Sequence, residues 1–330
     1  MSKVRIAVDC MGGDNAPTEI VKGCVEDLKT GEDTLVLVGK SGIINSELSK
    51  YKYDKERIEI VDAPEVIEND EIPTNAIRRK KNSSMVLGLN LVKEGKADAF
   101  ISAGNTGALL AGATVIVGRI KGVERPCLAT LIPTEKGPSL LMDVGANTDC
   151  KPNYIVQFAK MGSVYFENVM GVKNPKVGIV NIGVEEEKGN LMTREAHKLL
   201  NETDLNFIGN AEARDILTHV ADVLVCDGFV GNIILKFGEG MAMTFFRMVK
   251  NSLMSSFIAK IGAVLCLKPI KALVKTMDYS EIGGAPFLGL TSLVVKAHGA
   301  SNAKAIVGAV NQCRSFIEKD IVNKIQKSLN

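Results

Sequence analysis

The chain of 330 residues contains few aromatic residues, and none of them is tryptophan. Phe, Trp and Tyr make up 5% of the sequence, which argues against stacking platforms for nucleic-acid bases. The net charge is also small, +2 at pH 7, so the molecule as a whole lacks the basic surface of a nucleic-acid-binding protein. We therefore expect no nucleic-acid partner, and any electrostatic recognition must be local.

The cysteines show no spacing that indicates a cross-link or a metal site. They are Cys10, Cys24, Cys127, Cys150, Cys226, Cys266 and Cys313, and no two form a C-x-x-C pair. An odd number of cysteines without such pairs argues against a disulfide framework and against structural zinc. We expect reduced thiols in a cytosolic protein, and no metal site.

Long hydrophobic runs are missing as well. No stretch reaches the roughly 18 to 20 apolar residues that a membrane-spanning helix needs. The first residues, MSKVRIAV, enter a predicted strand without the apolar region of a signal peptide. The sequence therefore predicts a soluble cytoplasmic protein, unless a surface segment holds it against a membrane.

Short apolar runs alternate with longer helical segments along the chain, and hydrophobic residues make up 46% of it. The runs that predict strands are residues 4–8, 34–39, 58–63, 98–104, 127–133, 139–145, 177–183, 206–210 and 221–228. Most are continuously apolar, which indicates strands buried on both faces of a mainly parallel sheet. The repeated strand–helix units predict a doubly wound, three-layer α/β fold, with residues 1–330 in a single domain.

Glycine and polar residues follow nearly every predicted strand. The strand ends read DCMGGD, AGNTGA, DVGAN, IGVEEEKGN, IGNAEARD and CDGFVGN. In an open α/β sheet, the carboxyl ends of the strands form the ligand crevice. Turn and cap preferences of Gly, Asn and Asp explain any single one of these ends. Six of them in one chain favour a polar site rich in backbone N–H groups.

The segment AGNTGALLAG is the best candidate for an anion site. Gly104 and Gly107 allow tight turns, and Asn105 or Thr106 can cap the following helix, whose N-terminus attracts negative charge. The fingerprint G-x-x-x-x-G-K-[ST] is absent, as is G-x-G-x-x-G after the first strand. The loop therefore predicts a phosphate pocket outside the nucleotide-binding classes, and we expect no cofactor.

Charged residues at other strand ends are candidates to complete this pocket. Lys188 ends the segment EEEK, which by itself suits a solvated turn, but beside anion-binding loops it is a candidate partner for an anionic substrate. Aspartates that can orient donors, accept protons, bind a metal through water or simply cap helices are Asp9, Asp14, Asp143 and Asp227.

Covalent catalysis has little support, because the chain has no G-x-S-x-G elbow and only three histidines. His197 and His219 lie at positions typical of structural residues. His298, beside the glycine turn of KAHGAS, is a candidate general acid or base, although a hydrogen-bonded turn histidine is commoner. Without a nucleophile on the protein, one bound substrate would attack another, and backbone N–H groups would stabilise the oxyanion.

Nine motifs together resemble one known family. They are VDCMGGDNAP, SAGNTGALLAGA, LMDVGANTDCKP, FAKMGSVY, NIGVEEEKGN, FIGNAEARD, VCDGFVGNIILK, GGAPFLGL and VKAHGAS. In this order and spacing, from Ile6 to Ser301, they resemble the bacterial phosphate acyltransferases of phospholipid synthesis. Two departures are Cys10, where alanine is usual, and Ile282, where tyrosine is usual.

The resemblance implies an acyl-acyl carrier protein:phosphate transacylase. Such an enzyme moves a long-chain acyl group from the carrier-protein thioester to inorganic phosphate, and the acyl phosphate feeds a glycerol-3-phosphate acyltransferase. The family's fold is similar to that of isocitrate and isopropylmalate dehydrogenases and of phosphate acetyltransferase, and its members are homodimers at the membrane surface. A dehydrogenase of the isocitrate or isopropylmalate type is the alternative, and it would need paired aspartates for Mg²⁺ and a cofactor loop.

The resemblance also implies roles for individual residues. The family's proposed phosphate-contacting lysine corresponds to Lys188, and its asparagine corresponds to Asn232 in GFVGN. With His298, these are the expected catalytic residues. The expected substrate and phosphate site comprises Asp9, Gly12, Gly13, Asp14, Gly104, Asn105, Thr106, Gly107, Asp143, Asn147 and Asp227, where the two adjacent glycines permit a close approach of substrate to backbone.

A helical hairpin is predicted at residues 241–281. One apolar stripe begins at Leu253, Pro269 interrupts the helix, and a second stripe follows at Ile270, Leu273, Val274 and Met277. A hairpin packed into a dimer interface or core fits the pattern about as well. Because lysines beside an apolar stripe suit anionic headgroups, we expect the hairpin to project and bind the inner face of the cell membrane. The expected contacts are Leu253, Phe257, Ile261, Lys268 and Lys271.

An acidic carrier protein would need a local basic patch on this nearly neutral chain. RRKK, at residues Arg78–Lys81, and the lysines beyond Lys260 are candidates. A solvated charged face is the alternative explanation for each.

Overall fold

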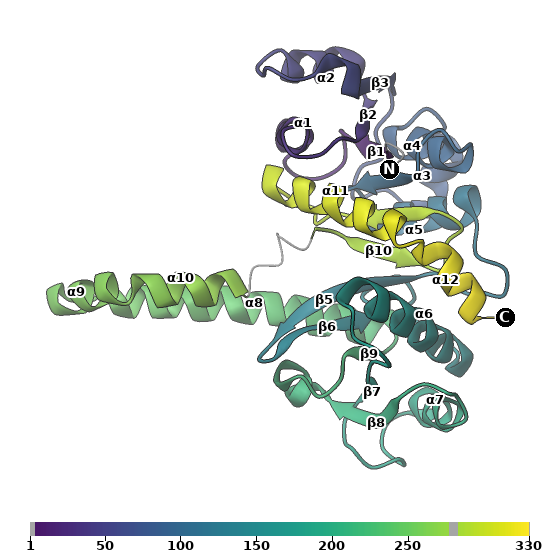
Figure 1. Ribbon diagram of the computed structural model, residues 1–330, viewed down its shortest axis with the longest axis vertical. Helices are drawn as coiled ribbons and strands as arrows, with labels where there is room; N and C mark the ends of the chain where they lie inside the picture. Colours follow the sequence, from purple (N-terminus) through teal and green to yellow (C-terminus); the bar gives the residue numbers. More distant parts are fainter. Residues whose placement is uncertain (1–3, 277–282, 330) are drawn as a thin grey trace.

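A computed structural model describes residues 4–276 and 283–329 (Figure 1). The end of the predicted hairpin, with Met277, and the departure at Ile282 lie outside the described residues. In the described part, one sheet of eleven strands runs through the molecule with helices on both of its faces.

The strands follow the apolar runs of the sequence. Their bounds are β1 Arg5–Asp9, β2 Thr34–Gly39, β3 Ile58–Asp62, β4 Ala99–Ser102, β5 Cys127–Thr134, β6 Gly137–Met142, β7 Val177–Asn181, β8 Phe207–Glu212, β9 Val223–Val225, β10 Ala285–Leu288 and β11 Leu293–Lys296. All nine predicted strands are present. The two that the sequence analysis did not identify, β10 and β11, have only four residues each.

The order of the strands divides the sheet into two parallel halves. Across the sheet the order is β3-β2-β1-β4-β11-β10-β5-β6-β9-β7-β8. The pairings β11–β10, β10–β5 and β5–β6 are antiparallel, and all others are parallel. Because three antiparallel pairings separate β11 from β6, the two parallel halves run in opposite directions. In a uniformly parallel sheet, all polar strand ends would lie at one edge. Here the ends of the two halves lie at opposite edges of the sheet.

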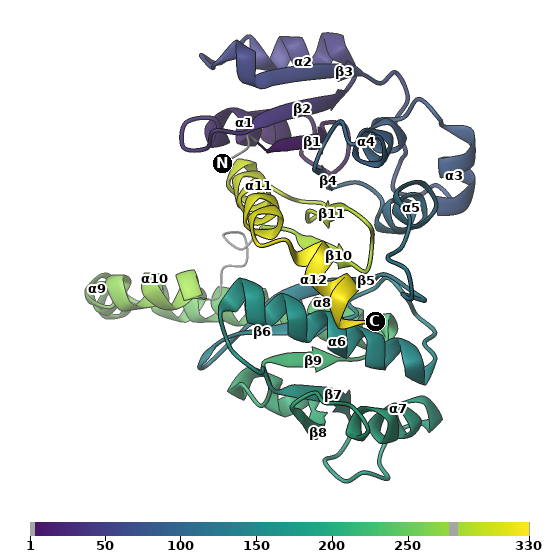
Figure 2. The same ribbon diagram turned by 45° about the vertical axis from the view of Figure 1, so that its right-hand side comes forward.

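The helices bury two apolar clusters, one on each face of the sheet. Their bounds are α1 Thr18–Asp27, α2 Ser41–Leu48, α3 Pro73–Arg79, α4 Ser84–Lys93, α5 Thr106–Gly112, α6 Pro152–Met170, α7 Leu191–Asn201, α8 Gly228–Leu253, α9 Phe257–Leu265, α10 Leu267–Thr276, α11 Ala303–Glu318 and α12 Ile321–Ser328. Helices α1, α2, α6, α7, α11 and α12 pack on one face (Figure 2), and α3, α4 and α5 on the other. The expected three-layer α/β architecture is confirmed.

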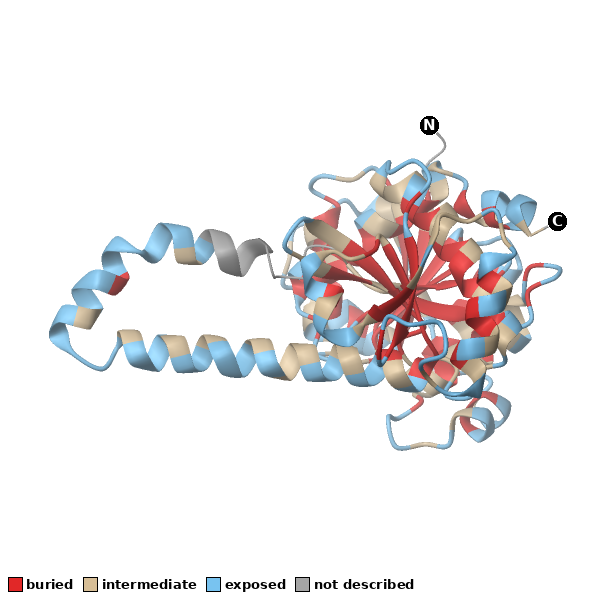
Figure 3. Ribbon diagram, turned by 90° about the horizontal axis from the view of Figure 1, so that it is seen from below, coloured by how far each residue is buried: buried red, intermediate tan, exposed pale blue. Residues whose placement is uncertain are grey.

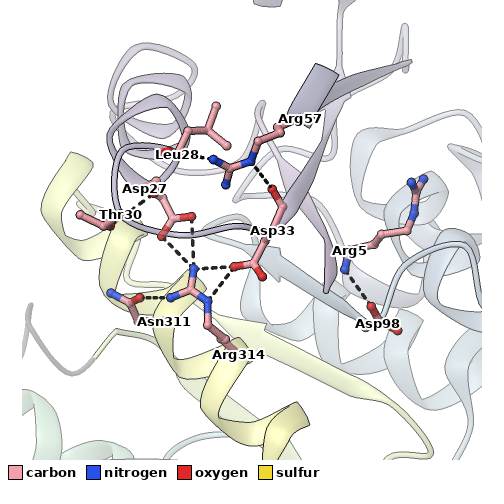
Figure 4. A network of polar contacts seen from close by, with 9 residues as sticks. All are labelled: Arg5, Asp27, Leu28, Thr30, Asp33, Arg57, Asp98, Asn311 and Arg314. Carbon is pink, nitrogen blue, oxygen red and sulfur yellow. Dashed lines mark hydrogen bonds and ion pairs between the residues drawn. The ribbon is translucent and has the colours of Figure 1, made fainter. Parts of the chain in front are cut away.

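A buried ionic network joins helix α11 to the first half of the sheet (Figure 4). The Arg314 guanidinium donates to Asp33, with an Nε–Oδ2 distance of 2.7 Å, and to both carboxylate oxygens of Asp27 at 3.4 Å. Both aspartates are buried. Arg57 adds bonds to the backbone oxygens of Asp33 and Leu28. This network holds α11, and with it the loop that precedes α11, against β2 and α1.

The predicted hairpin projects from the body of the protein (Figures 1 and 3). Its first helix, α8, starts before residue 241 and is continuous from Gly228 to Leu253. Pro269 does not interrupt a helix: the break falls at Cys266, and Pro269 lies in the first turn of α10. Proline is tolerated there because the N–H groups of a first turn have no partner within the helix.

The tip of the hairpin is exposed rather than packed into the core of the chain. In α9, Phe257, Ile258 and Leu265 are 78%, 81% and 79% exposed. Lys260, Lys268 and Lys271 are also exposed. In the described parts of the chain, no helix is both long and apolar enough to cross a bilayer.

Candidate active site

A cleft of about 520 Å³ opens where the two halves of the sheet meet. The loops after β1, β4 and β11 contribute Asp14, Thr106 and His298, and the loop after β6 contributes Gly145. One side of α8 contributes Asn232. Four residues expected in the site from sequence therefore line one cleft: Asp14, Thr106, Asn232 and His298.

The turn that carries Asp14 is tied to the turn that carries His298. The backbone N–H of Asp14 donates to the oxygen of Gly299 at 2.8 Å, and Asn15 Nδ2 donates to the oxygen of Ala300 at 3.1 Å. Gly13 has φ +101°, and a Cβ there would lie 2.8 Å from Ala103 Cβ. Only glycine fits this conformation and this space without strain.

Asp9 lies behind the cleft and orders its backbone. The carboxylate is buried and accepts from Ser102 Oγ at 2.7 Å and from the Met11 N–H at 3.0 Å. Ser102 Oγ in turn accepts from the Gly104 N–H at 3.1 Å. A Cβ at Gly12 would lie 2.7 Å from both Asp9 Oδ2 and the Gly104 nitrogen. Asp9, Gly12 and Gly104 therefore position the loops rather than line the cleft.

Asn105 and Gly107 are structural parts of the AGNTGALLAG loop. Asn105 caps α5, because its Oδ1 accepts from the Ala108 N–H at 3.0 Å, and its Nδ2 donates to the Asn69 oxygen at 3.0 Å. A Cβ at Gly107 would lie 2.7 Å from Pro73 Cγ. Between them, Thr106 is the residue of this loop that reaches the cleft.

Asp143 is buried and organises the loop after β6. Its carboxylate accepts from the N–H groups of Leu128, Ala146 and Asn147 and from Asn147 Nδ2, at 2.7–3.1 Å. Burial raises the pKa of Asp143, and these hydrogen bonds oppose the rise. The Asp143 carboxylate does not line the cleft, so its role is to fix the shape of the loop after β6.

Asp227 and Asn147 set the start of α8. Asp227 Oδ1 accepts from the Val230 N–H at 2.8 Å, and the Gly228 N–H donates to the Asn147 oxygen at 2.7 Å. A Cβ at Gly231 would lie 1.9 Å from the backbone oxygen of Asp143. This close approach of α8 places Asn232 beside Gly145, 3.5 Å from where a Gly145 Cβ would lie. The capping explanation is therefore correct for Asp227.

Lys188 is not among the residues that line the cleft. It is exposed in the loop between β7 and α7, where its backbone oxygen accepts from Asn181 Nδ2 at 3.1 Å. Strand β7 is separated from β6 by β9. The expected contact of Lys188 with phosphate stays a prediction.

His298 has one ring nitrogen engaged by its own turn. The Ala300 N–H donates to Nδ1 at 3.2 Å. A ring nitrogen that accepts a hydrogen bond is unprotonated, so the neutral imidazole carries its hydrogen on Nε2. His298 is thus both a hydrogen-bonded turn histidine and a donor at the wall of the cleft.

Lys296 lines the cleft and was missed by the sequence analysis. Its Nζ donates to the oxygens of Ala103 at 3.1 Å and Ala297 at 2.5 Å. Burial, and secondly the charge of Lys236, lower its pKa to about 8, while Asp9 and Asp14 oppose this. A signal was present in the sequence, because the apolar run LVV ends in this lysine just as other strands end in polar residues.

Comparisons with known proteins connect this cleft to one family. A model of the family described as "Fatty acid synthesis protein" matches residues 4–324. The phosphate acyltransferase of Clostridium acetobutylicum is 55% identical over 98% of both chains. The chain belongs to the phosphate acyltransferase family. Its relatives support an acyltransferase activity.

Solved structures similar to this family member share its fold. A phosphotransacetylase from Streptococcus pyogenes superposes with a TM-score of 0.64 at 16% identity, over 96% of this chain and 94% of the other. A branched-chain phosphotransacylase from Enterococcus faecalis V583 gives a TM-score of 0.58 at 12% identity, over 94% and 98%. The expected likeness to the phosphate acetyltransferase fold is confirmed.

For a phosphate acyltransferase, the cleft offers a set of cationic and neutral donors. Lys236 and Lys296 supply positive charge, and Asn232, Thr106 and His298 supply neutral hydrogen-bond donors. Asp14 and Glu239 add two carboxylates on the same walls. These side chains can hold a phosphate dianion by charge and hydrogen bonds. They can also place a hydrogen-bond donor next to a carbonyl oxygen that becomes negatively charged during the reaction.

Proposed function

We propose that the protein transfers a long-chain acyl group from an acyl carrier protein thioester to inorganic phosphate. The products are an acyl phosphate and the free thiol of the carrier protein. Family membership supports acyl transfer to phosphate, and the carrier protein and the long chain are our extension. This extension rests on the position of α8. One end of this helix lines the cleft, and exposed apolar side chains follow along the helix away from the cleft.

Phosphate binding is supported by the charge of the cleft. Lys236 can neutralise part of the charge of a dianion, while Asn232 and His298 can orient it by hydrogen bonds. Phosphate needs no base to act as a nucleophile at neutral pH, which agrees with the described lining of the cleft, where no serine or cysteine is found. Catalysis then depends on positioning and on donors that face the developing oxyanion.

A long acyl chain is supported by the exposed row on α8. At every fourth position, Phe229, Ile233, Phe237, Met241 and Phe245 are 50–70% exposed. Residues four apart are neighbours on a helix, so this row is continuous along α8. It starts beside the cleft residues Asn232 and Lys236 and leads to the tip of the hairpin. An apolar chain that leaves the cleft along α8 would remain in contact with apolar side chains.

Binding of the hairpin to the inner face of the cell membrane belongs to the same proposal. The tip combines exposed apolar residues with Lys260, Lys268 and Lys271, and exposed apolar patches of this kind mark interaction sites. Apolar insertion and attraction to anionic headgroups reinforce each other. We further propose that the protein is a homodimer and that a glycerol-3-phosphate acyltransferase receives the acyl phosphate.

The test is thiol release from acyl carrier protein with and without phosphate. We expect release only with phosphate, together with an acyl phosphate that hydroxylamine traps as a hydroxamate. A palmitoyl carrier protein should react at least about tenfold better than an acetyl one, since each buried CH₂ contributes about 0.8 kcal/mol. Phosphate-independent release would contradict the proposal. Reduction of NAD⁺ or NADP⁺ with 2-hydroxy acids would contradict it as well and would favour the dehydrogenase alternative.

A further inference from the structure

The Nζ atom of Lys296 is held at the end of β11 by two backbone oxygens. Strand β11 pairs with β4 so that Lys296 lies opposite Ser102. The Ala103 and Ala297 oxygens then accept two of the three hydrogens of the ammonium group. Within residues 4–276 and 283–329, the structure offers no third acceptor for this group. Because Lys296 lines the cleft, its remaining hydrogen is available to a bound substrate.

Burial, and secondly the like charge of Lys236, make this ammonium group unusually ready to lose a proton. Charged and titratable groups around it are Lys236 and Glu239 from α8, Asp9 from β1, Asp14 from the following turn and His298 from the turn after β11. The pKa of about 8 that results lies near that of an alkyl thiol, about 8.5. Proton transfer between groups of matched pKa is efficient in both directions.

The chemistry of acyl transfer to phosphate needs a proton at the sulfur. Attack on a thioester gives an intermediate that can expel either phosphate or the thiolate. Phosphate leaves more readily than an alkyl thiolate, because its conjugate acid is the stronger acid. An intermediate whose sulfur is not protonated therefore expels phosphate and returns to the starting materials. A donor beside the sulfur would direct the intermediate towards the acyl phosphate.

We propose that Lys296 is a catalytic residue that protonates the departing thiol during acyl transfer. The inference rests on the proposed function and extends it by naming the general acid. An oxygen of HPO₄²⁻ bonds to the carbonyl carbon, the carbon–sulfur bond breaks, and sulfur takes a proton from the Lys296 ammonium. The neutral amine then takes the proton that the acyl phosphate still carries. Thioester and HPO₄²⁻ thus become thiol and acyl phosphate dianion, and Lys296 returns to its charged form.

The acid role is tested with two thioesters of the same fatty acid, one with an alkyl thiol and one with an aryl thiol. Aryl thiols are more acidic and leave without a proton. For Lys296→Met we expect kcat to fall about a hundredfold or more with the alkyl thioester. With the aryl thioester the fall should stay below about tenfold, and the KM for phosphate should change little. In the wild type, kcat for the alkyl thioester alone should decline above pH 8, as the pKa of about 8 requires.

A second variant separates proton donation from phosphate binding. Lys296→Arg keeps the positive charge but cannot give up a proton near neutral pH. We expect it to lose the alkyl thioester activity like Lys296→Met and to keep the aryl thioester activity. Lys198→Met, on the exposed face of α7, is the matched control, and circular dichroism and thermal unfolding report folding of each variant.

The possible outcomes are distinct. Equal loss with both thioesters, or full alkyl activity in Lys296→Arg, would show that Lys296 binds phosphate or supports the fold, and would overturn the acid role. If the wild type released no thiol in response to phosphate from either thioester, the proposed function itself would fail and this role with it.

Discussion

At the scale of the single residue, the side chains of the cleft divide into those that face the substrate and those that hold the loops. Asp9, Asp143 and Asp227 each accept two or more local hydrogen bonds or cap a helix, and they are buried. Asn232, His298 and Lys296 face the cleft. Substitutions in the first group should impair folding and activity together, whereas substitutions in the second should impair activity alone.

Asn232→Ala tests this division most directly. Loss of one oriented donor to a bound or developing anion typically costs about 2 to 4 kcal/mol, so kcat/KM should fall about a hundredfold or more. Because Asn232 is exposed, the thermal unfolding midpoint should stay close to that of the wild type.

Lys188→Ala is expected to reduce turnover likewise. Activity within about threefold of wild type for either variant, measured by thiol release, would remove that residue from the site.

Lys296 is expected to reduce the stability of the protein while it serves catalysis. Its folded pKa of about 8 lies below the usual 10.5, so at neutral pH the folded state holds a charge that it disfavours. Lys296→Met should therefore raise the free energy of unfolding by about 1 to 3 kcal/mol at pH 7.

The sign of this effect fixes its pH dependence. Between pH 8 and 10.5, the unfolded chain binds more protons at this lysine than the folded one, so the wild type gains stability as pH rises. The difference between Lys296→Met and wild type in urea unfolding should shrink across this range. A variant that is less stable at pH 7, or a difference that grows above pH 8, would contradict the argument.

At the scale of the element, α8 connects chemistry with surface. Its first turn is fixed by Asp227 and the loop after β6, its next turns supply Asn232 and Lys236 to the cleft, and its remainder projects with α9 and α10 (Figure 3). A helix that leaves the body has no core to bury its apolar residues. These residues must find another apolar surface, which is the physical basis for the proposed membrane contact.

Polar substitutions on the hairpin should separate membrane binding from catalysis. We expect Leu253, Phe257 and Ile261, all changed to Ser, to abolish co-sedimentation with vesicles of anionic phospholipid. Turnover of a soluble thioester should remain within about twofold, because none of the three lines the cleft. Ile43, Val172 and Leu217, exposed on the body, changed together to Ser form the control. A hairpin variant that unfolds or loses its dimer would show that the stripe is a packing surface.

At the scale of the whole molecule, a net charge of +2 leaves recognition of an acidic carrier protein to local patches. Of the predicted patch Arg78–Lys81, three members are exposed. Lys80 is engaged instead, since it pairs with Glu71 at 2.5 Å and donates to the Val66 oxygen at 2.6 Å. Helix α3, which carries Arg78 and Arg79 of the patch, packs against α5, whose first residue Thr106 lines the cleft.

Salt should therefore weaken the use of the carrier protein more than the chemistry. Raising the salt concentration from about 0.05 M to 0.3 M shortens the screening length below about 10 Å. The KM for the acyl carrier protein should then rise several-fold, and the KM for a small neutral thioester should not. Arg78→Glu with Arg79→Glu should reproduce the effect of salt at low ionic strength. A KM for the carrier protein that does not depend on salt would exclude electrostatic docking.

Local patterns in the sequence determined the elements of this protein. Nine strands, the three-layer class, the helices of the hairpin and the cap positions follow from apolar periodicity and from residues such as Asn105 and Asp227, whose preferences act over a few neighbours. Whether the hairpin packs or projects did not follow from periodicity. The same local rules placed His298 beside a glycine turn at a site, and the family resemblance added Asn232, which lies in the first turns of α8. They also identified the family, because its motifs are contiguous.

The tertiary structure alone decided which strand ends meet. Strands β10 and β11 are too short for a clear periodic signal, yet they join the two halves of the sheet and bring Lys296 beside Ser102. Strand order also separates Lys188 from the cleft by placing β9 between β7 and β6. Neighbours across a sheet are set by the packing of segments far apart in the chain, and side-chain periodicity contains no information on which segments pair. The burial that lowers the pKa of Lys296 is a property of that packing, so it arises only when the two halves of the sheet come together.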